Sequence, residues 1–322
     1  PGDRGLIVAP LFHAAAVITA FSCVAGGGCL VIQRGFDPAA VVTALADERI
    51  ALTTLVPAMI QAYLLAVPDA AERTYPALRA MAYGGSAIAE TTLRQAMATF
   101  GCDFYQGFGQ TESSAGLTYL TELDHRAALD GRPELLASCG RALPGTEIHV
   151  VDDDGREVPT GQVGEVVARG PQLMSGYWNR PEETAAALRD GWLFTGDAGR
   201  LDDEGYLTIC DRLRDMVVTG GENVYPREVE DALLAHPAVA DAAVIGVPDR
   251  TWGEAVHAVV VLREGATTEV DELRDHCRAR LAGFKVPRSV EVVAELPRNA
   301  SGKVRKHLLR QPHWAGRERG VA

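Results

Sequence analysis

The sequence has no long apolar run and few basic residues, and each shortage argues against a class of protein. No stretch of about 18 apolar residues occurs, so we expect no helix that spans a membrane. The longest apolar segment, residues 8–31, is broken by His13, Ser22 and a glycine triplet. Lys and Arg number 31 against 43 Asp and Glu, for a net charge of −12. Broad nucleic-acid binding needs a dense basic face, so this composition disfavours it.

Cysteine pairs are also absent. The six cysteines, at positions 23, 29, 102, 139, 210 and 277, form no Cys-x-x-Cys motif and lie in apolar or isolated settings. We interpret them as reduced thiols and expect a cytoplasmic protein. The chain starts at Pro1 with no initiator methionine and no signal peptide, and it opens directly into a β-like run. We therefore expect it to be the later part of a longer protein.

The first part of the chain, residues 1–137, alternates short apolar runs with segments of helical spacing. Strands are predicted at 6–9, 29–32, 51–55, 78–83 and 103–108, and helices at 38–49, 57–65 and 89–100. This order predicts an α/β fold with a mostly parallel sheet covered on both faces. Ligands of such sheets bind at the carboxyl ends of the strands, so the segments after Tyr83 and Tyr105 are expected to line a site.

Two further parts are predicted, since 322 residues exceed one ordinary domain. Turn signals multiply over 138–213, which predicts a β-rich subdomain of hairpins with strands at 147–151, 164–169 and 206–211. After a charged segment near Arg214, residues 214–322 are expected to form a small α+β domain with its helices on one face of a mixed sheet. Its predicted strands are 216–219, 240–247, 255–262 and 290–293, and its predicted helices are 226–236, 270–281 and 303–310.

Six short motifs occur along the chain in a fixed order. They are Gly84-Gly85-Ser86, Gln106-Gly107-Phe108-Gly109-Gln110-Thr111-Glu112, Thr195-Gly196-Asp197, Asp211-Arg212, Gly220-Gly221-Glu222-Asn223-Val224-Tyr225-Pro226 and Pro297-Arg298-Asn299-Ala300-Ser301-Gly302-Lys303. Each motif alone is weak, but the set in this order resembles the acyl-CoA and aryl-CoA synthetases of the adenylate-forming superfamily over nearly the whole chain. The segments Pro-Leu-Phe-His at 10–13 and Gly-Gly-Glu-Asn-Val-Tyr-Pro at 220–226 are most similar to those of fatty acyl-CoA ligases.

The resemblance implies a fold and a two-step reaction. Residues 1–137 would be the parallel-sheet portion of the large AMP-binding domain, 138–213 its β-rich subdomain, and 214–322 the small C-terminal domain. A carboxylic acid, of fatty type on this resemblance, attacks the α-phosphate of ATP with Mg²⁺ present, giving acyl-AMP and pyrophosphate. The thiol of coenzyme A then displaces AMP, and the small domain rotates between the two steps.

The resemblance also assigns roles in nucleotide binding. Thr111 is expected at the phosphates and Glu112 at Mg²⁺, since a hydroxyl suits phosphate and a carboxylate suits a hard cation. The other motif residues that would bind the nucleotide or the acyl group are Gly84, Gly85, Ser86, Gln106, Gly107, Phe108, Gly109 and Gln110. Asp197 is expected at the ribose hydroxyls and Arg212 at the ribose or phosphate. The competing interpretations are a helix N-cap pair beginning a helix near Ser113, a tight turn, and a surface ion pair.

Four further roles concern catalysis and domain rotation. Lys303 is one of three lysines in the chain, with 285 and 306, and would contact the substrate carboxylate and α-phosphate. A lysine at the start of a helix is the competing interpretation, and the helix dipole disfavours it. Arg214 would be the hinge. Gly220 and Gly221 would line the pantetheine tunnel, although a plain hairpin turn also explains the glycines, and Asn223 is expected among the cofactor-binding residues. His13 would lie beside the acyl carbonyl, or be a buried structural histidine.

One family motif is absent. The glycine-rich phosphate loop that ends in Pro-Lys-Gly lies upstream of Pro-Leu-Phe-His in the family, and nothing in this sequence matches it. We therefore expect an uncovered edge or face on the first sheet, and the activity of the chain by itself stays open. Three functions remain: the C-terminal portion of an acyl-CoA synthetase, an adenylation domain that loads a carrier protein, and a truncated relative that only binds. The sequence sets neither acyl length nor oligomeric state.

Overall fold

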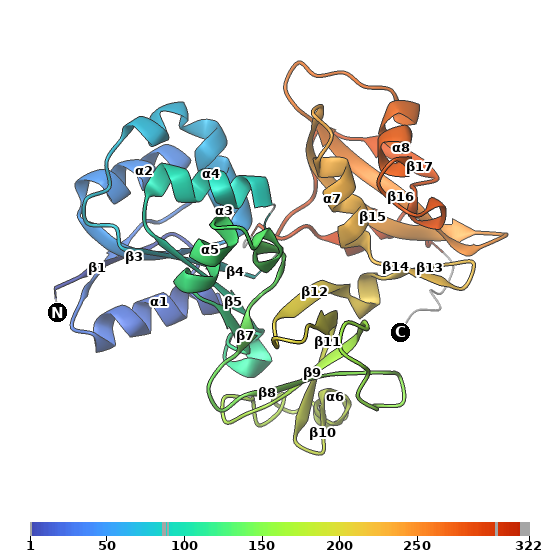
Figure 1. Ribbon diagram of the computed structural model, residues 1–322, viewed down its shortest axis with the longest axis horizontal. Helices are drawn as coiled ribbons and strands as arrows, with labels where there is room; N and C mark the ends of the chain where they lie inside the picture. The colour runs from blue at the N-terminus through green and yellow to red at the C-terminus, as the bar shows by residue number, and fades with distance from the viewer. Residues whose placement is uncertain (1, 86–87, 89, 300–301, 316–322) are drawn as a thin grey trace. The chain divides into compact units, whose positions relative to one another are not determined.

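A computed structural model describes residues 2–85, 88, 90–299 and 302–315 of the chain (Figure 1). The chain divides into two compact units. The first consists mainly of residues up to 195 together with 200–209, and the second mainly of 196–199, 210–299 and the chain from 303 onwards. None of the helices in the described residues is long and apolar enough to cross a membrane. All six cysteines are free in the structure.

The first unit is built on a seven-stranded sheet with the order β2-β1-β3-β4-β5-β6-β7. Its strands are β1 Arg4–Ile7, β2 Cys29–Ile32, β3 Ile50–Leu55, β4 Ala80–Gly84, β5 Asp103–Phe108, β6 Thr118–Leu120 and β7 Arg141–Ala142. The pairings among β1 to β5 are parallel, and β6 and β7 add antiparallel strands. The predicted α/β fold with a mostly parallel sheet is therefore confirmed.

Helices cover both faces of this sheet. They are α1 Ala14–Ala25, α2 Pro38–Asp47, α3 Pro57–Ala66, α4 Glu90–Phe100 and α5 Glu122–Leu129. The strand order reverses between β1 and β3, and crossover connections are right-handed, so α1 lies on the face opposite to α2, α3 and α4 (Figure 1). Helix α2 begins as the sequence predicts, because Asp37 accepts hydrogen bonds from the amides of Ala39 and Ala40 and Pro38 occupies the first turn.

Helix α1 was not predicted from the sequence. The segment is apolar almost throughout, so no polar face marks its helical period. As a result Ile18, Phe21 and Val24 of α1 are exposed by 44%, 72% and 59%, and Ile32 of the edge strand β2 by 54%. Ile32 on the edge strand agrees with the expectation of an uncovered edge or face, as an uncovered edge, while the exposed side chains of α1 lie on a helix that covers the sheet. Helix α5 was not predicted either; its start is a reciprocal pair of hydrogen bonds between Thr121 and Asp124.

A second sheet has the order β10-β11-β9-β8, with β12 pairing β11. Its strands are β8 Glu147–Val151, β9 Gly164–Arg169, β10 Leu188–Arg189, β11 Trp192–Leu201 and β12 Leu207–Arg212, and the short helix α6 Pro181–Ala187 precedes β10. A small core of Cys139, Val150, Val166 and Leu207 underlies it. The strands predicted at 147–151 and 164–169 are confirmed to the residue.

The second unit contains a mixed sheet with the order β14-β13-β16-β15, and β17 pairs with β16 in parallel. The elements are β13 Val217–Thr219, β14 Glu222–Val224, α7 Pro226–Leu234, β15 Val239–Asp249, β16 Gly253–Leu262, α8 Val270–Arg278, β17 Ser289–Val292 and α9 Lys306–Arg310. The prediction of a small α+β domain with a mixed sheet is confirmed.

The prediction that all helices of this domain share one face is wrong. Side chains of α7 and α8, including Val229 and Leu273, pack on the face that carries Val244. Because successive side chains of a strand point to opposite faces, Ala243 lies on the other face, where Leu309 of α9 packs near it. The strands are apolar on both faces, which requires cover on both. Helix α9 also begins at Lys306, three residues later than predicted.

Candidate functional site

The carboxyl ends of β4 and β5 approach each other more closely than side chains would allow. Gly84 pairs with Gly107, and a Cβ atom on Gly84 would lie 2.4 Å from the carbonyl oxygen of Gly107. Gly85 has a φ of +80°, which favours glycine. Both predicted glycines therefore have a local structural requirement, and they leave backbone without side-chain cover at the edge where ligands of parallel sheets bind. Ser86 lies outside the described residues.

The loop after β5 is a tight turn and not a helix start. Thr111–Ser113 forms a single 3₁₀ turn, in which the hydroxyl of Ser113 accepts from the amide of Gln110 and donates to its carbonyl at 3.1 Å. The chain then runs into β6, so the competing interpretation of a helix beginning near Ser113 is wrong. A Cβ atom on Gly109 would lie 2.6 Å from the carbonyl of Ala115, so only glycine fits there. Thr111 is exposed on this turn.

Glu112 is half-buried and its carboxylate is oriented by another loop. Its Oε1 accepts a hydrogen bond from the hydroxyl of Tyr177 at 2.8 Å, and its carbonyl accepts from the amide of Met174 at 2.7 Å. Burial, and then the neighbouring Glu112, raise the pKa of Tyr177, so the phenol stays a donor at neutral pH. One carboxylate beside a hydroxyl fits Mg²⁺, which takes few protein ligands and completes its shell with water and phosphate oxygens. Sequence reasoning missed Tyr177, because no local pattern links it to Glu112.

Three residues of the same motif have side chains that are engaged in contacts within the first unit. Gln106 is buried, and its Oε1 accepts from the hydroxyl of Tyr83 at 3.4 Å. The Tyr83 hydroxyl also lies 2.9 Å from Nε2 of His125. Phe108 packs against the core of the second sheet. The side chain of Gln110 donates to the carbonyl of Thr195 at 3.2 Å. Within 106–112, the side chains best placed for a ligand are therefore those of Thr111 and Glu112.

His13 lies just after β1, at the end of the sheet where the strand order reverses. Its carbonyl accepts from the amides of Ala16 and Val17, which begins α1, and its amide donates to the carbonyl of Pro10 at 2.8 Å. The residue is half-buried, so it is not a fully buried core histidine. Because β1, β4 and β5 run in parallel, His13 lies at the same edge of the sheet as Gly85 and Thr111.

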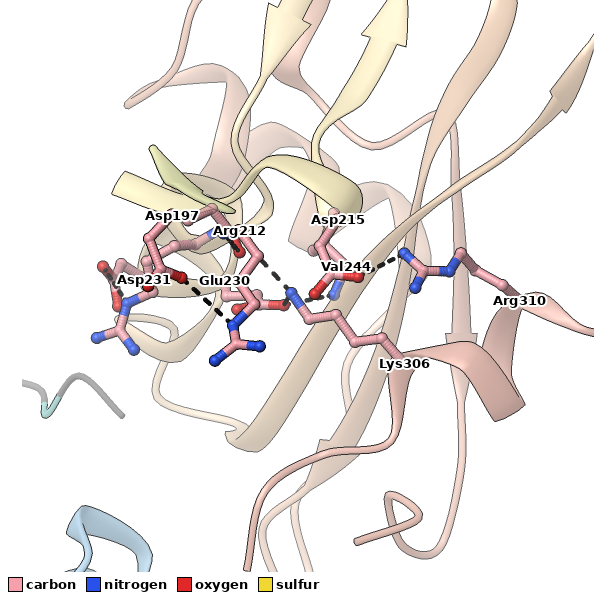
Figure 2. A network of polar contacts seen from close by, with 10 residues as sticks. Asp197, Arg212, Asp215, Glu230, Asp231, Val244, Lys306 and Arg310 are labelled. Atoms are coloured by element: carbon pink, nitrogen blue, oxygen red, sulfur yellow. Dashed lines mark hydrogen bonds and ion pairs between the residues drawn. The ribbon is translucent and has the colours of Figure 1, made fainter. Parts of the chain in front are cut away.

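In the second unit, a buried carboxylate is surrounded by cations. Oδ1 of Asp197 lies 3.3 Å from Nε of Arg212, and the Asp197 side chain is only 8% exposed (Figure 2). Burial raises the pKa of Asp197 to about 6, while Arg212, Lys303 and Arg214 counteract that rise. Burial also lowers the pKa of Lys303, and Arg212 and Arg214 lower it further. Asp211 is a second carboxylate that acts on Asp197, so three cations face two carboxylates, and the net positive charge suits an anion such as phosphate or a carboxylate.

Lys303 lies on a turn. Its amide donates to Oδ1 of Asn299 at 2.9 Å, its carbonyl accepts from the amide of Asn299, and a bridge links Arg298 to Val304. Gly302 before it has a φ of +82°. Ala300 and Ser301 lie outside the described residues. The competing interpretation of a lysine at a helix start is wrong, because α9 begins only at Lys306.

Sequence reasoning missed a second polar network in this unit, shown in Figure 2. Nζ of Lys306 lies 2.7 Å from Oε1 of Glu230 and 3.9 Å from Oδ2 of Asp211. Arg310, one helical turn later, pairs with Asp215 at 2.7 Å. Burial alone would lower the pKa of Lys306, but Glu230 and Asp211 outweigh it and raise that pKa. The acids at 211 and 215 and the bases at 306 and 310 share a spacing of four residues, but nothing in the sequence links the two segments.

Residues 220 and 221 form the two-residue turn between β13 and β14, with φ values of +62° and +85°. Positive φ at both central residues is typical of a two-residue β-hairpin turn, and this backbone conformation favours glycine. Gly220 has an added requirement, since a Cβ atom there would lie 2.5 Å from the ring of Trp252. Asn223 on β14 is exposed, as is Arg214, which lies in the 3₁₀ turn Leu213–Asp215. The turn explains the glycines locally, and their role toward pantetheine stays a prediction.

Comparison with known proteins identifies the family. The model of the AMP-binding enzyme family matches residues 1–178, and that of the AMP-binding enzyme C-terminal domain matches residues 228–303. The chain therefore belongs to the AMP-binding enzyme family, as the six motifs indicated.

Individual relatives are named as acid ligases. The chain is 41% identical over 325 residues to the medium/long-chain fatty acid–CoA ligase FadD8 of Mycobacterium tuberculosis, covering 99% of this chain and 56% of that ligase. It is 42% identical over 310 residues to a feruloyl-CoA synthase of an Amycolatopsis species, covering 96% and 61%. It is 38% identical over 320 residues to the fatty acid–acyl-carrier-protein ligase ScoC of Streptomyces coeruleorubidus, covering 99% and 61%. The chain thus spans about three fifths of the length of these relatives.

Solved structures show the same fold. The amide bond synthetase McbA of Marinactinospora thermotolerans superposes with a TM-score of 0.87 at 38% identity, covering 96% of this chain and 62% of that one. The o-succinylbenzoate coenzyme A synthetase MenE of Bacillus subtilis, solved with ATP and magnesium, gives a TM-score of 0.83 at 34% identity, covering 95% and 61%. These matches confirm the adenylate-forming fold, and the MenE structure shows that a member of the family binds ATP with magnesium.

Proposed function

We propose that the full-length protein carrying this chain is an AMP-forming ligase that activates a carboxylic acid with ATP and transfers the acyl group to coenzyme A. The observation that carries the proposal is the cluster of Asp197, Arg212, Arg214 and Lys303 in the second unit. An acid attacking a phosphate brings two anions together. Fixed cations in a partly buried cluster stabilise the negative charge that builds in the transition state.

Lys303 is the group assigned to that charge. Burial and the neighbouring arginines lower the pKa of Lys303, because they destabilise its charged form. An anion bound beside Lys303 would offset this cost and form a charge-assisted contact with the ammonium group. Asp197 carries the opposite charge above pH 6 and would accept hydrogen bonds from the ribose hydroxyls. Arg212, paired with Asp197 at 3.3 Å, would hold the same ribose or the phosphate. Arg214 stays the proposed hinge.

The first unit carries further predicted site residues. Thr111 on its exposed turn would donate to the phosphates, and Glu112, oriented by Tyr177, would hold Mg²⁺. Bound Mg²⁺ supplies charge neutralisation on the phosphates. Gly84, Gly85 and the backbone at 107–109 would let the nucleotide and the acyl group lie against the main chain. His13 would lie beside the acyl carbonyl.

The named relatives differ in the acceptor of the acyl group. ScoC is named for a carrier protein and McbA for an amide bond, whereas FadD8 and feruloyl-CoA synthase are named for coenzyme A. The Gly220-Gly221-Glu222-Asn223 turn resembles the coenzyme A enzymes, which favours that thiol. Loading of a carrier protein is the alternative. Fatty and aromatic acids are both candidate substrates, because the two named relatives with the highest identity differ in this respect.

A pyrophosphate-release assay with the full-length protein tests the proposal. A panel of fatty and aromatic acids is offered with Mg²⁺ and ATP, and coenzyme A, a phosphopantetheinylated carrier protein or an amine is then added to the preformed acyl-AMP. Acid-dependent pyrophosphate release followed by thioester with coenzyme A supports the proposal. Release with transfer only to the carrier protein favours the alternative. ATP binding without pyrophosphate release for any acid would contradict both and favour a relative that only binds.

A further inference from the structure

A cluster of two histidines and one glutamate in the second unit is formed by residues outside the six sequence motifs. His257 is on β16, Glu291 on β17, and His313 on the turn that follows α9. One nitrogen of each histidine and one carboxylate oxygen all lie within 4.8 Å of one another. Strands β16 and β17 pair in parallel next to these residues, and Figure 1 shows them side by side. We propose that these three residues form a binding site for a divalent transition-metal ion of the zinc class.

An unsatisfied buried nitrogen is the second, independent observation. The His257 side chain is only 8% exposed, and its Nε2 has no hydrogen-bond partner among the described residues. Oε2 of Glu291 lies 3.6 Å from this nitrogen, which is beyond hydrogen-bond distance. A buried polar atom without a partner costs free energy, and a cation between the nitrogen and the carboxylate would satisfy both.

The other ring nitrogen of His257 is held as a metal-ligating histidine requires. Nδ1 lies 2.7 Å from the hydroxyl of Ser289. In the tautomer with the proton on Nδ1, this N–H donates a hydrogen bond to the hydroxyl oxygen of Ser289, and the lone pair of Nε2 is available to a metal near Glu291. In metal sites such an outer hydrogen bond fixes the tautomer and the ring orientation of the ligand.

His313 is brought to this place by its neighbours. Its amide donates to the carbonyl of Arg310, and Nε1 of Trp314 donates to the carbonyl of Gly246 on β15 at 2.9 Å. The ring centroids of His313 and His257 lie 5.0 Å apart. The turn after α9 is thus fixed against the sheet, and the third ligand comes from a segment distant in sequence from the other two.

The ligand set selects the class of ion. Two imidazole nitrogens and one carboxylate oxygen suit Zn²⁺ and similar transition metals, whereas Ca²⁺ and Mg²⁺ prefer oxygen alone. In a tetrahedral zinc site, ligand atoms lie about 3.3–3.6 Å apart, so the three groups must contract by about 1 Å. Glu291 is 56% exposed and His313 is exposed, so both can rotate inward. Water would take the fourth position. Bound metal would fasten the turn after α9 to β16 and β17.

Isothermal titration of the full chain with ZnCl₂ tests the proposal, with the visible absorption of added Co²⁺ as a second readout of tetrahedral geometry. We expect one ion per chain and a rise in the melting temperature with ion concentration. His313→Ala should weaken binding at least tenfold, because it removes a ligand, and Ser289→Ala should weaken it about tenfold, because it removes only the orienting hydrogen bond. His313 is exposed, so its loss should leave the fold of the metal-free chain intact.

His307→Ala is the matched control, since His307 is exposed on α9 and belongs to no such cluster among the described residues. It should bind zinc like the unaltered chain. Absence of stoichiometric zinc binding by the unaltered chain would overturn the proposal and favour a plain contact of His257 with Glu291. Equal binding by His313→Ala and the unaltered chain would overturn it too, since the ion would then lie elsewhere. Neither result bears on the proposed ligase activity.

Discussion

Asp197 shows how the surroundings of one side chain set its titration. Its carboxylate is almost completely buried, and burial outweighs three nearby cations, so its pKa rises to about 6. A carboxylic acid in an unfolded chain has a pKa of about 3.9. Between these values the folded state binds more protons than the unfolded state. The contribution of Asp197 to stability is therefore greatest below about pH 4 and is lost as the pH rises to about 6.

Asp197→Asn should remove the decrease in stability that ionisation of Asp197 causes as the pH rises from about 4 to about 6. A shift of about two pKa units corresponds to about 3 kcal/mol, so the stability of the variant relative to the unaltered protein should rise by up to that amount between pH 4 and pH 7. Urea unfolding of both proteins across this range measures the difference. Parallel stability profiles for the two proteins would show that Asp197 does not titrate as its burial implies.

The hairpin turn between β13 and β14 separates two causes of glycine preference. Gly220 and Gly221 both have positive φ, but only a Cβ atom on Gly220 would meet the ring of Trp252, at 2.5 Å. Each replacement by alanine should cost about 1 kcal/mol or more from backbone strain. Gly220→Ala should cost more than Gly221→Ala because the Trp252 ring must also move. The denaturation midpoints of the two variants measure this difference in stability. An equal loss of stability in both would mean that the Trp252 ring moves aside without a cost in free energy.

Helix α9 has only five residues and depends on its contacts for its position. Lys306 and Glu230 are 15% and 12% exposed, so replacing Lys306 with Met leaves a buried, uncompensated carboxylate. We expect this change to cost about 3–5 kcal/mol and to speed hydrogen–deuterium exchange in α9 and around Asp211. Adding Glu230→Gln should recover part of the loss.

Arg278→Ala is the control for that comparison. Its pair with Asp275 is more than half exposed, so the change should alter stability by less than about 1 kcal/mol. If Lys306→Met were as mild as Arg278→Ala, the network in Figure 2 would not anchor α9.

The sequence predicted the elements whose signals lie within a few neighbouring residues, and it did not predict contacts between residues far apart in the chain. The strands at 29–32, 103–108, 147–151 and 164–169 were predicted to the residue, because apolar runs and turn residues mark strands locally. Helix α1 was missed, since an apolar helix without a polar face has no visible period. The contact between Tyr177 and Glu112 and the one between Arg310 and Asp215 join residues separated by 65 and 95 positions. No pattern within a short window could reveal such contacts.

The chain combines a net negative charge with a local cluster of positive charge around Asp197. A net charge of −12 argues against polyanion binding over a broad face. Arg212, Arg214 and Lys303 lie around Asp197, and Asp197, Arg212 and Lys303 belong to motifs that resemble the adenylate-forming family. The central claim is therefore that this cluster serves phosphate chemistry, with Lys303 acting in the step that forms acyl-AMP.

Single-turnover kinetics of the two half-reactions in the full-length protein test this claim most directly. Lys303→Ala should slow acyl-AMP formation by about 100-fold or more, because the charge that builds on the phosphate loses its cation. Thioester formation from supplied acyl-AMP should change little. Lys285→Ala, which removes a lysine paired with Glu228, should leave both steps nearly unchanged. A loss of equal size in both half-reactions of Lys303→Ala, or no loss in either, would contradict the account.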